Sequence, residues 1–104
     1  MTRILKFALD LVQRQTLWIP AGSRVLSIQS QKGVLRMWAE CADPGIDESR
    51  IFWILWTGDR LPDVHLRYHA TIQMNDYVWH IYEEIAGPAP SQEREVVGHF
   101  GNLG

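Results

Sequence analysis

The chain has 104 residues, enough for one domain and too few for two. Ten lysines and arginines nearly balance twelve aspartates and glutamates, which argues against direct nucleic-acid binding. Cys41 is the single cysteine, so an internal disulfide is excluded and a reducing cytoplasm is the expected compartment. No apolar run approaches the ~20 residues of a membrane-spanning helix, and the N-terminal segment has no apolar leader, so we expect a soluble protein that does not contact a membrane.

Alternation of apolar and polar residues predicts four short strands in the first part of the chain. They cover residues 4–9, 17–19, 26–29 and 34–41. Pro20 and Gly22 mark the turn after the second strand, and Gly33, which tolerates a positive φ, closes a tight hairpin before the fourth. The fourth strand is predicted to place Arg36 and Trp38 together on one face.

The fifth strand is predicted over residues 51–56, where six large apolar residues follow one another. No helix could keep such a run on one side. As a strand, the run points Trp53 to one face and Trp56 to the other, each with two aliphatic or aromatic neighbours. Both faces therefore need cover, from the core on one side and from a second layer or another molecule on the other.

Two further strands are predicted over residues 65–74 and 77–83, with a turn at Asn75 and Asp76. Strict alternation in the sixth strand predicts that Tyr68 faces inward and that His65 and His69 face outward. Short strands separated by turns at roughly ten-residue spacing are typical of sandwiches and barrels. We therefore predict an all-β fold, a small antiparallel sandwich or barrel of about seven strands.

The β domain is predicted to span residues 1–86. The segment Gly87-Pro88-Ala89-Pro90 then interrupts the chain, and residues 87–104 contain few large apolar side chains. This composition is typical of a tail that is disordered or forms a short helix.

Four matches in order give the chain a family resemblance. They are Ile19-Pro20-Ala21-Gly22 leading into Val25-Leu26-Ser27-Ile28-Gln29, then Trp38-Ala39, then Thr57-Gly58, and last Val78-Trp79-His80-Ile81-Tyr82-Glu83. Together they resemble a family of short proteins of unknown function that phages, prophages and some bacteria encode. The resemblance covers about residues 3–84, although members often carry a histidine where this chain has Asp59. It implies a small β domain of phage or prophage origin and supplies no activity.

Neither catalysis nor a metal site is predicted from the chemistry-bearing residues. His65 and His69 are four residues apart, a spacing that on a strand separates them by about 13 Å, too far for two ligands about 2 Å from one ion. Cys41 has no neighbouring signature of a reactive thiol, and a buried, apolar role is the usual one for a lone cysteine. We expect a protein that is not an enzyme, binds no metal and needs no cofactor.

His80 and Tyr82 share one face of the last predicted strand and are candidates for binding a small ligand. The alternative for His80 is a half-buried side chain that makes one structural hydrogen bond, because polar groups in apolar surroundings are usually satisfied. Both interpretations stay open at this stage.

Five tryptophans are many for so short a chain, and they cannot all fit one small interior. Tryptophan and arginine are enriched at the energetic centres of protein interfaces. We therefore predict a partner-binding surface formed by Arg36, Trp38, Trp53 and Trp56. Core packing is the alternative explanation for the same rings.

The first function predicted is a non-catalytic, phage-derived module that binds a protein in the cytoplasm of the host cell. Its partner would be a defence complex or another host factor, which the module would inhibit by occupying a surface. The alternative is a small-ligand sponge, for instance for nucleotides, that acts as a homo-oligomer with an aromatic-lined pocket. An enzyme ranks last, because no set of acid, base and nucleophile can be assembled.

Overall fold

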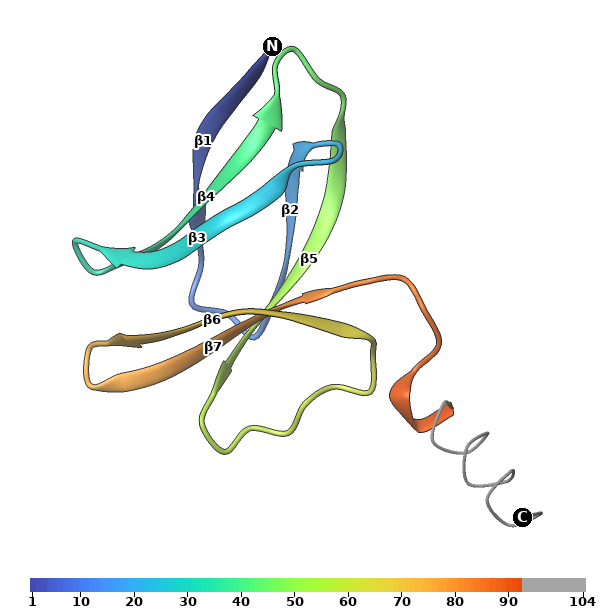
Figure 1. The fold of residues 1–104 in the computed structure, drawn as a ribbon. Helices are drawn as coiled ribbons and strands as arrows, with labels where there is room; N and C mark the ends of the chain where they lie inside the picture. Colours follow the sequence, from blue (N-terminus) through green and yellow to red (C-terminus); the bar gives the residue numbers. More distant parts are fainter. Residues whose placement is uncertain (93–104) are drawn as a thin grey trace.

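The structure is a computed structural model that describes residues 1–92, and within them seven strands form two antiparallel sheets (Figure 1). The all-β prediction is confirmed, and all seven predicted strands are present, six of them with longer bounds and the sixth strand one residue shorter. The strands are β1 (Thr2–Leu9), β2 (Arg14–Pro20), β3 (Arg24–Gln31), β4 (Val34–Ala42), β5 (Asp47–Trp56), β6 (Leu66–Met74) and β7 (Tyr77–Glu84).

One sheet has three strands in the order β1-β4-β3, and the other has four in the order β2-β5-β7-β6. The chain passes between the sheets after β1, after β2 and after β4. The edge strand β3 of the first sheet lies against the edge strand β6 of the second, as Figure 1 shows. The sheets therefore enclose one core between them in a sandwich-like arrangement.

Two tight hairpins join β3 to β4 and β6 to β7. The first turns at Lys32 and Gly33, with φ of 53° and 75°, and the second at Asn75 and Asp76, with φ of 55° and 66°. A positive φ at both central residues is the geometry whose twist matches that of the flanking strands. Glycine, asparagine and aspartate tolerate this geometry better than other residues, which explains why the sequence predicted both turns.

The core is the layer of aliphatic and aromatic side chains between the two sheets. Burying such side chains is the main favourable term in folding a domain of this size. Its fully buried members come from every strand of both sheets: Leu9, Ile19, Ile28, Leu35, Met37, Phe52, Ile54, Met74, Trp79 and Ile81.

Most of the apolar run in β5 is covered on both faces within the chain, and only Trp56 at its end is exposed. Phe52 and Ile54 are buried between the sheets. On the opposite face Leu55 is also buried, and it shares a cavity with Leu61 of the loop that connects β5 to β6. Ile51 is half-buried on the same face. The loop after β5 therefore supplies part of the second layer that the sequence required.

The predicted faces of β6 are wrong at Tyr68 and His69. The β6–β7 register shifts between Tyr68 and Ala70, so His69 is an extra residue without a partner in β7. This β-bulge displaces the alternation by one residue. Tyr68 consequently lies outside, with its ring 5.5 Å from that of Tyr82, and His69 turns inward to Glu83.

Residues 85–92 pack against the loop before β6. The backbone N–H of Ile85 donates to the carbonyl of His65 at 2.9 Å, and the backbone N–H of Ser91 donates to Asp63 at 3.0 Å. The Ser91 hydroxyl also donates to Asp63. The first residues of the predicted tail thus contact the β domain, and residues 93–104 lie outside the described part of the chain. Within residues 1–92, no helix is long and apolar enough to cross a membrane.

Candidate functional site

Arg36 and Trp38 lie on the outer face of the three-stranded sheet. Their neighbours Leu35 and Met37 point into the core, so alternation directs Arg36 and Trp38 away from it. Both are half-buried, and β4 pairs with β1 and β3. The other two predicted partner-binding residues lie in the four-stranded sheet. The four residues therefore come from two different sheets.

Trp53 lies on the outer face of the four-stranded sheet in contacts with its own chain. Its indole N–H donates to Glu84 at 2.9 Å, and the guanidinium of Arg14 lies 5.8 Å from the ring centroid. Arg14 also forms an ion pair with Glu84 at 3.8 Å. Because the ring is half-buried and its N–H donor already has a partner, we assign Trp53 a structural role within its own sheet.

Trp56 ends β5 beyond the core and is 47% exposed. Its ring stacks on that of Tyr77, which is 51% exposed, with centroids 5.0 Å apart. The buried Trp79 meets Trp56 edge-on at 5.2 Å. Trp56 and Tyr77, which we call the surface aromatic pair, are thus rigidly supported from beneath and open to solvent above.

His80 is held by hydroxyl groups on the outer face of β7. Its Nε2 lies 2.8 Å from the Thr57 hydroxyl and its Nδ1 lies 3.1 Å from the Thr71 hydroxyl. The Thr71 hydroxyl in turn lies 2.7 Å from that of Tyr68. A neutral imidazole donates from one nitrogen and accepts at the other, so both of its positions are satisfied. The predicted structural role of His80 is thus met by two hydrogen bonds in place of one.

Two adjoining cavities lie on this outer face. The larger, about 620 Å³, lies between the loop of residues 61–66 and the segment that contains Pro90 and Ser91. The smaller, about 240 Å³, reaches Thr57 and His80, and both cavities are lined by Leu61 and Tyr82. The two predicted ligand-binding residues, His80 and Tyr82, therefore do line a cavity together.

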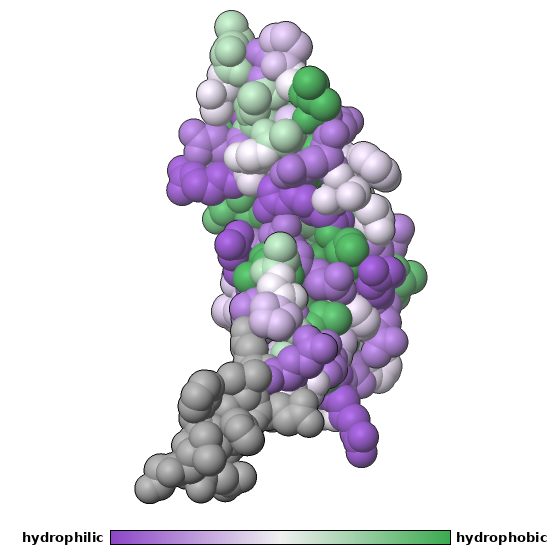
Figure 2. All heavy atoms as spheres, turned by 90° about the vertical axis from the view of Figure 1, so that its right-hand side faces the viewer, coloured by the Kyte–Doolittle hydropathy of each residue, from purple (hydrophilic) through white to green (hydrophobic). Residues whose placement is uncertain are grey.

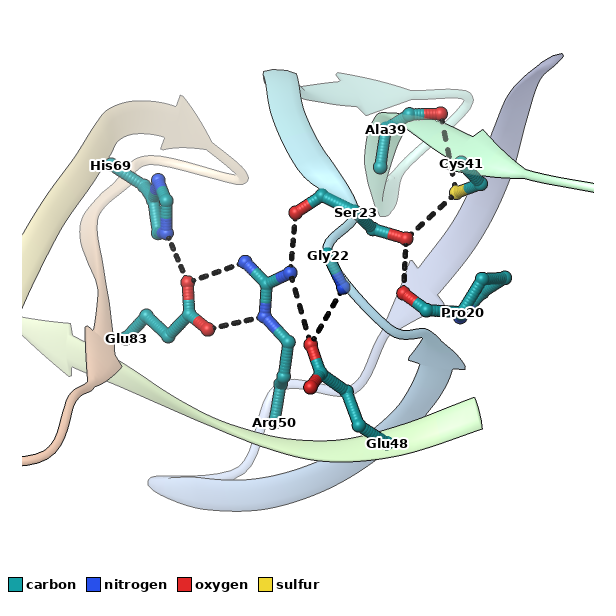
Figure 3. Close-up of polar contacts among 9 residues, drawn as sticks. All are labelled: Pro20, Gly22, Ser23, Ala39, Cys41, Glu48, Arg50, His69 and Glu83. Atoms are coloured by element: carbon teal, nitrogen blue, oxygen red, sulfur yellow. Dashed lines mark hydrogen bonds and ion pairs between the residues drawn. The ribbon is translucent and has the colours of Figure 1, made fainter. Parts of the chain in front are cut away.

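A buried ionic network occupies the other side of the four-stranded sheet (Figure 3). Glu83 of β7 is only 4% exposed. The guanidinium of Arg50 donates to both of its carboxylate oxygens, at 2.5 and 2.9 Å. His69, brought inward by the bulge, lies 2.8 Å from one of them. Such a two-pronged contact is the strongest geometry for an arginine–carboxylate pair.

The pKa values of the pair shift in opposite directions. Burial alone raises the pKa of Glu83, but the hydrogen bonds from His69 and Arg50 and the charge of Arg50 outweigh it and lower the pKa from 4.5 to about 2. The hydrogen bond with Glu83 raises the pKa of Arg50 against the opposing effect of burial. Glu83 is therefore ionised at neutral pH and paired with a cation.

The network extends to the other sheet through Ser23, just before β3. Arg50 donates to the Ser23 carbonyl at 2.5 Å, as seen at the centre of Figure 3. The Ser23 hydroxyl donates to the Pro20 carbonyl at 2.5 Å and lies 3.2 Å from the thiol of Cys41, which is buried and free. Glu48 accepts a hydrogen bond from the backbone N–H of Gly22 at 3.1 Å. Arg50 thus joins strands of both sheets.

Sequence reasoning did not single out Arg50 or Glu83. A signal was present, because both fall at core-facing positions, two residues from Phe52 in β5 and from Ile81 in β7. Charges at such positions are almost always paired, so two of opposite sign on neighbouring strands predict a buried ion pair. In the described part of the chain, no cluster of three or more His, Cys, Asp or Glu residues could hold a metal ion.

These features define a small two-sheet β protein. The buried network of Arg50, His69 and Glu83, which we call the interior joint, lies inside it, and the surface aromatic pair lies outside. The chain belongs to a family described as a domain of unknown function (DUF7352), whose model matches residues 1–92. That span contains all seven strands and the segment that packs on the loop before β6. The predicted resemblance to a family of unknown function agrees with this match. No curated protein and no solved structure matches the chain.

Proposed function

We propose that this protein acts without catalysis, by binding a host protein and blocking its surface, and that it derives from a phage. The phage origin rests on the sequence resemblance, in which the segment from Val78 to Glu83 is the most specific part. A defence complex is the kind of partner that such an origin favours.

The surface aromatic pair is the observation that carries this proposal. Trp56 and Tyr77 lie side by side with about half of their surface exposed. Tryptophan and tyrosine anchor most energetic centres of protein interfaces, because they bury a large area at a small cost in side-chain entropy. On the face drawn in Figure 2, which is the right-hand side of Figure 1, hydrophobic residues form only separate small patches among hydrophilic ones, so that face offers no broad apolar interface.

The ionic network supports a binding role over a catalytic one. Arg50, His69 and Glu83 are directed at one another and are nearly buried, with side-chain exposures of 12%, 12% and 5%. A general acid or base must reach a substrate, and these groups reach each other. Their arrangement is that of a cross-link between strands.

Affinity capture tests this function with a matched pair of variants. The tagged protein is incubated with host lysate, and retained proteins are quantified by mass spectrometry. Trp56→Ala should reduce the retained partner strongly, since loss of an interface anchor costs about 2 kcal/mol or more, roughly thirtyfold in affinity. Trp18→Ala is the control, because Trp18 is 65% exposed on β2, away from the pair. Equal capture by wild type and Trp56→Ala would refute the assignment of the surface.

A second function, binding of a small ligand, is favoured by the cavities around Tyr82. A volume of about 620 Å³ is within the range of sites for drug-sized ligands and nucleotides. Calorimetric titration with a panel of nucleotides, together with native mass spectrometry for the oligomeric state, tests this function. Leu61→Trp should fill the shared part of both cavities and abolish binding. Absence of heat with every nucleotide, from a protein shown to be folded, would exclude the nucleotide sponge.

A further inference from the structure

We propose that the cavity beside the surface aromatic pair is a binding site for an arginine side chain of the partner protein. This inference rests on the proposed function, because it names the chemistry of the group that the partner inserts. The site has three parts: two aromatic side chains, one aspartate, and a cavity that these residues line together.

The cavity has a volume of about 300 Å³ and is lined by Trp56, Thr57, Asp76, Tyr77 and Val78. It lies where the end of β5 meets the hairpin between β6 and β7. The positive φ angles of Asn75 and Asp76 fix the turn, and the stack of Trp56 on Tyr77 fixes the two rings. A preformed site of this kind costs little conformational entropy when it is occupied.

Asp76 is the charged group of this cavity, and like Asp10, Asp47 and Asp59 it stands outside the ion pairs that other acidic residues of the described chain form. Asp43 pairs with Arg3, Glu40 with Arg24, Glu83 with Arg50, and Glu84 with Arg14. In contrast, none of the ion pairs formed among residues 1–92 includes Asp76. The carboxylate therefore attracts a cation from outside the described part of the chain.

A guanidinium group meets both the aromatic and the anionic part of the site. It lies flat on the face of a tryptophan or tyrosine through a cation–π contact, and its fork of N–H donors matches a carboxylate. Lysine offers only a compact, strongly hydrated charge and makes no planar stack. An apolar side chain in the cavity would desolvate Asp76 without giving it a partner, which is unfavourable, and an anion would be repelled by it. Arginine is the occupant that the cavity favours.

The inference is tested first with a small probe in place of a partner. The ¹⁵N-labelled protein is titrated with N-acetylarginine amide while amide and indole resonances are recorded by NMR. The neutral analogue N-acetylcitrulline amide, nearly identical in shape, is the control ligand. We expect saturable shifts of the Trp56 indole and of the Asp76 and Val78 amides with the arginine probe, and much weaker shifts with the citrulline probe. Equal shifts with both probes, or shifts confined to other residues, would overturn the proposal.

Variants then separate the two parts of the site. Asp76→Asn removes the charge and keeps a residue that tolerates positive φ, so the turn is retained. We expect it to weaken binding of the arginine probe about two- to fivefold, the factor for a solvent-exposed pair of opposite charges. Tyr77→Leu should weaken it by a similar factor through loss of the cation–π contact. An unchanged affinity in Asp76→Asn would contradict the proposal.

The two proposals fail in different ways. Capture of a partner that depends on Trp56, together with a probe that does not bind, would refute the arginine site and leave the binding function standing. Binding of the probe at Asp76, without any partner whose capture depends on Trp56, would support the arginine site and refute the proposed binding function.

Discussion

The interior joint around Glu83 and the surface around Trp56 use similar residues in opposite ways. In the joint, each charged group is turned toward another, and the burial of Glu83 is made tolerable by Arg50 and His69. At the surface, two aromatic rings and the carboxylate of Asp76 lie next to a cavity that the described residues do not fill. The comparison indicates that polar groups paired with one another hold the sheets together, whereas groups without a partner in the described chain are available to bind another molecule.

The largest effect is expected from Glu83→Gln. The variant keeps the shape of the side chain but removes the anion that Arg50 contacts with two hydrogen bonds, which leaves only the more distant Glu48 carboxylate at 4.0 Å. Loss of one partner of a buried pair typically costs about 3–5 kcal/mol. Urea-induced unfolding, followed by tryptophan fluorescence, measures the change in the free energy of unfolding. Glu40→Gln is the control, because its pair with Arg24 is exposed and should contribute less than about 1 kcal/mol. Similar losses in both variants would remove the distinction between joint and surface.

Acid should weaken the joint around Glu83. The pKa of Glu83 is lowered from 4.5 to about 2 in the folded protein, so the unfolded chain binds a proton more readily. The resulting stabilisation, on the order of 3 kcal/mol, is fully present above pH 4.5 and is lost as the pH falls toward 2. The free energy of unfolding, measured from pH 7 to pH 2, should therefore fall less steeply in Glu83→Gln than in wild type. Parallel curves would show that another carboxylate dominates acid unfolding.

His69→Ala should have an intermediate effect. It removes one hydrogen bond to the Glu83 carboxylate and the contact between the His69 and Phe52 rings, whose centroids are 5.9 Å apart. A hydrogen bond to a charged group contributes about 2 kcal/mol. His69→Gln, which retains an N–H donor, should lose less stability than His69→Ala in the same urea experiment. If both variants unfold as wild type, the bulge does not direct His69 to a structural role.

The smallest effect on stability is expected from Tyr77→Ser at the surface. Its ring is half exposed and stacks on Trp56, so its removal should lower the free energy of unfolding by about 1 kcal/mol or less. The same variant should lose most of the partner in affinity capture. A loss of several kcal/mol would instead show that Tyr77 contributes to the folded core and does not belong to the surface region.

The sequence was sufficient to predict the strands and hairpins, because these depend on local alternation and on turn residues such as Gly33 and Asn75. It was insufficient for the grouping of strands into sheets. Arg36 and Trp38 were expected beside β5, yet β4 pairs with β1 and β3, a choice made by contacts distant in the sequence. The bulge at His69 could not be predicted from the sequence for a related reason. An extra residue in one strand is recognised only when the pairing with the neighbouring strand is known.

Within the candidate site, the shared cavity of His80 and Tyr82 could be anticipated from strand faces. The exposure of Trp56 could not, because Trp56 shares a face with the buried Phe52 and Ile54 and is exposed only since it ends β5 beyond the core. The pairing of Trp56 with Tyr77 could not, because it joins the end of β5 to the start of β7. Asp76 was recognised only as a turn residue, although the same turn places it in the lining of the cavity.

The bulge in β6 also has a consequence for how this family can change over time. His69 has no opposite residue in β7, whereas Tyr68 and Ala70 pair with the adjacent residues Tyr82 and Ile81. Loss of one codon at position 69 would therefore leave every other side chain of β6 on its present face and would remove only the imidazole from Glu83. Most single-residue deletions in a strand invert all the side chains on one side of the gap. At this position alone in the β6–β7 ladder, a deletion acts like a point substitution, so the interior joint can gain or lose its histidine while the outer surface stays the same.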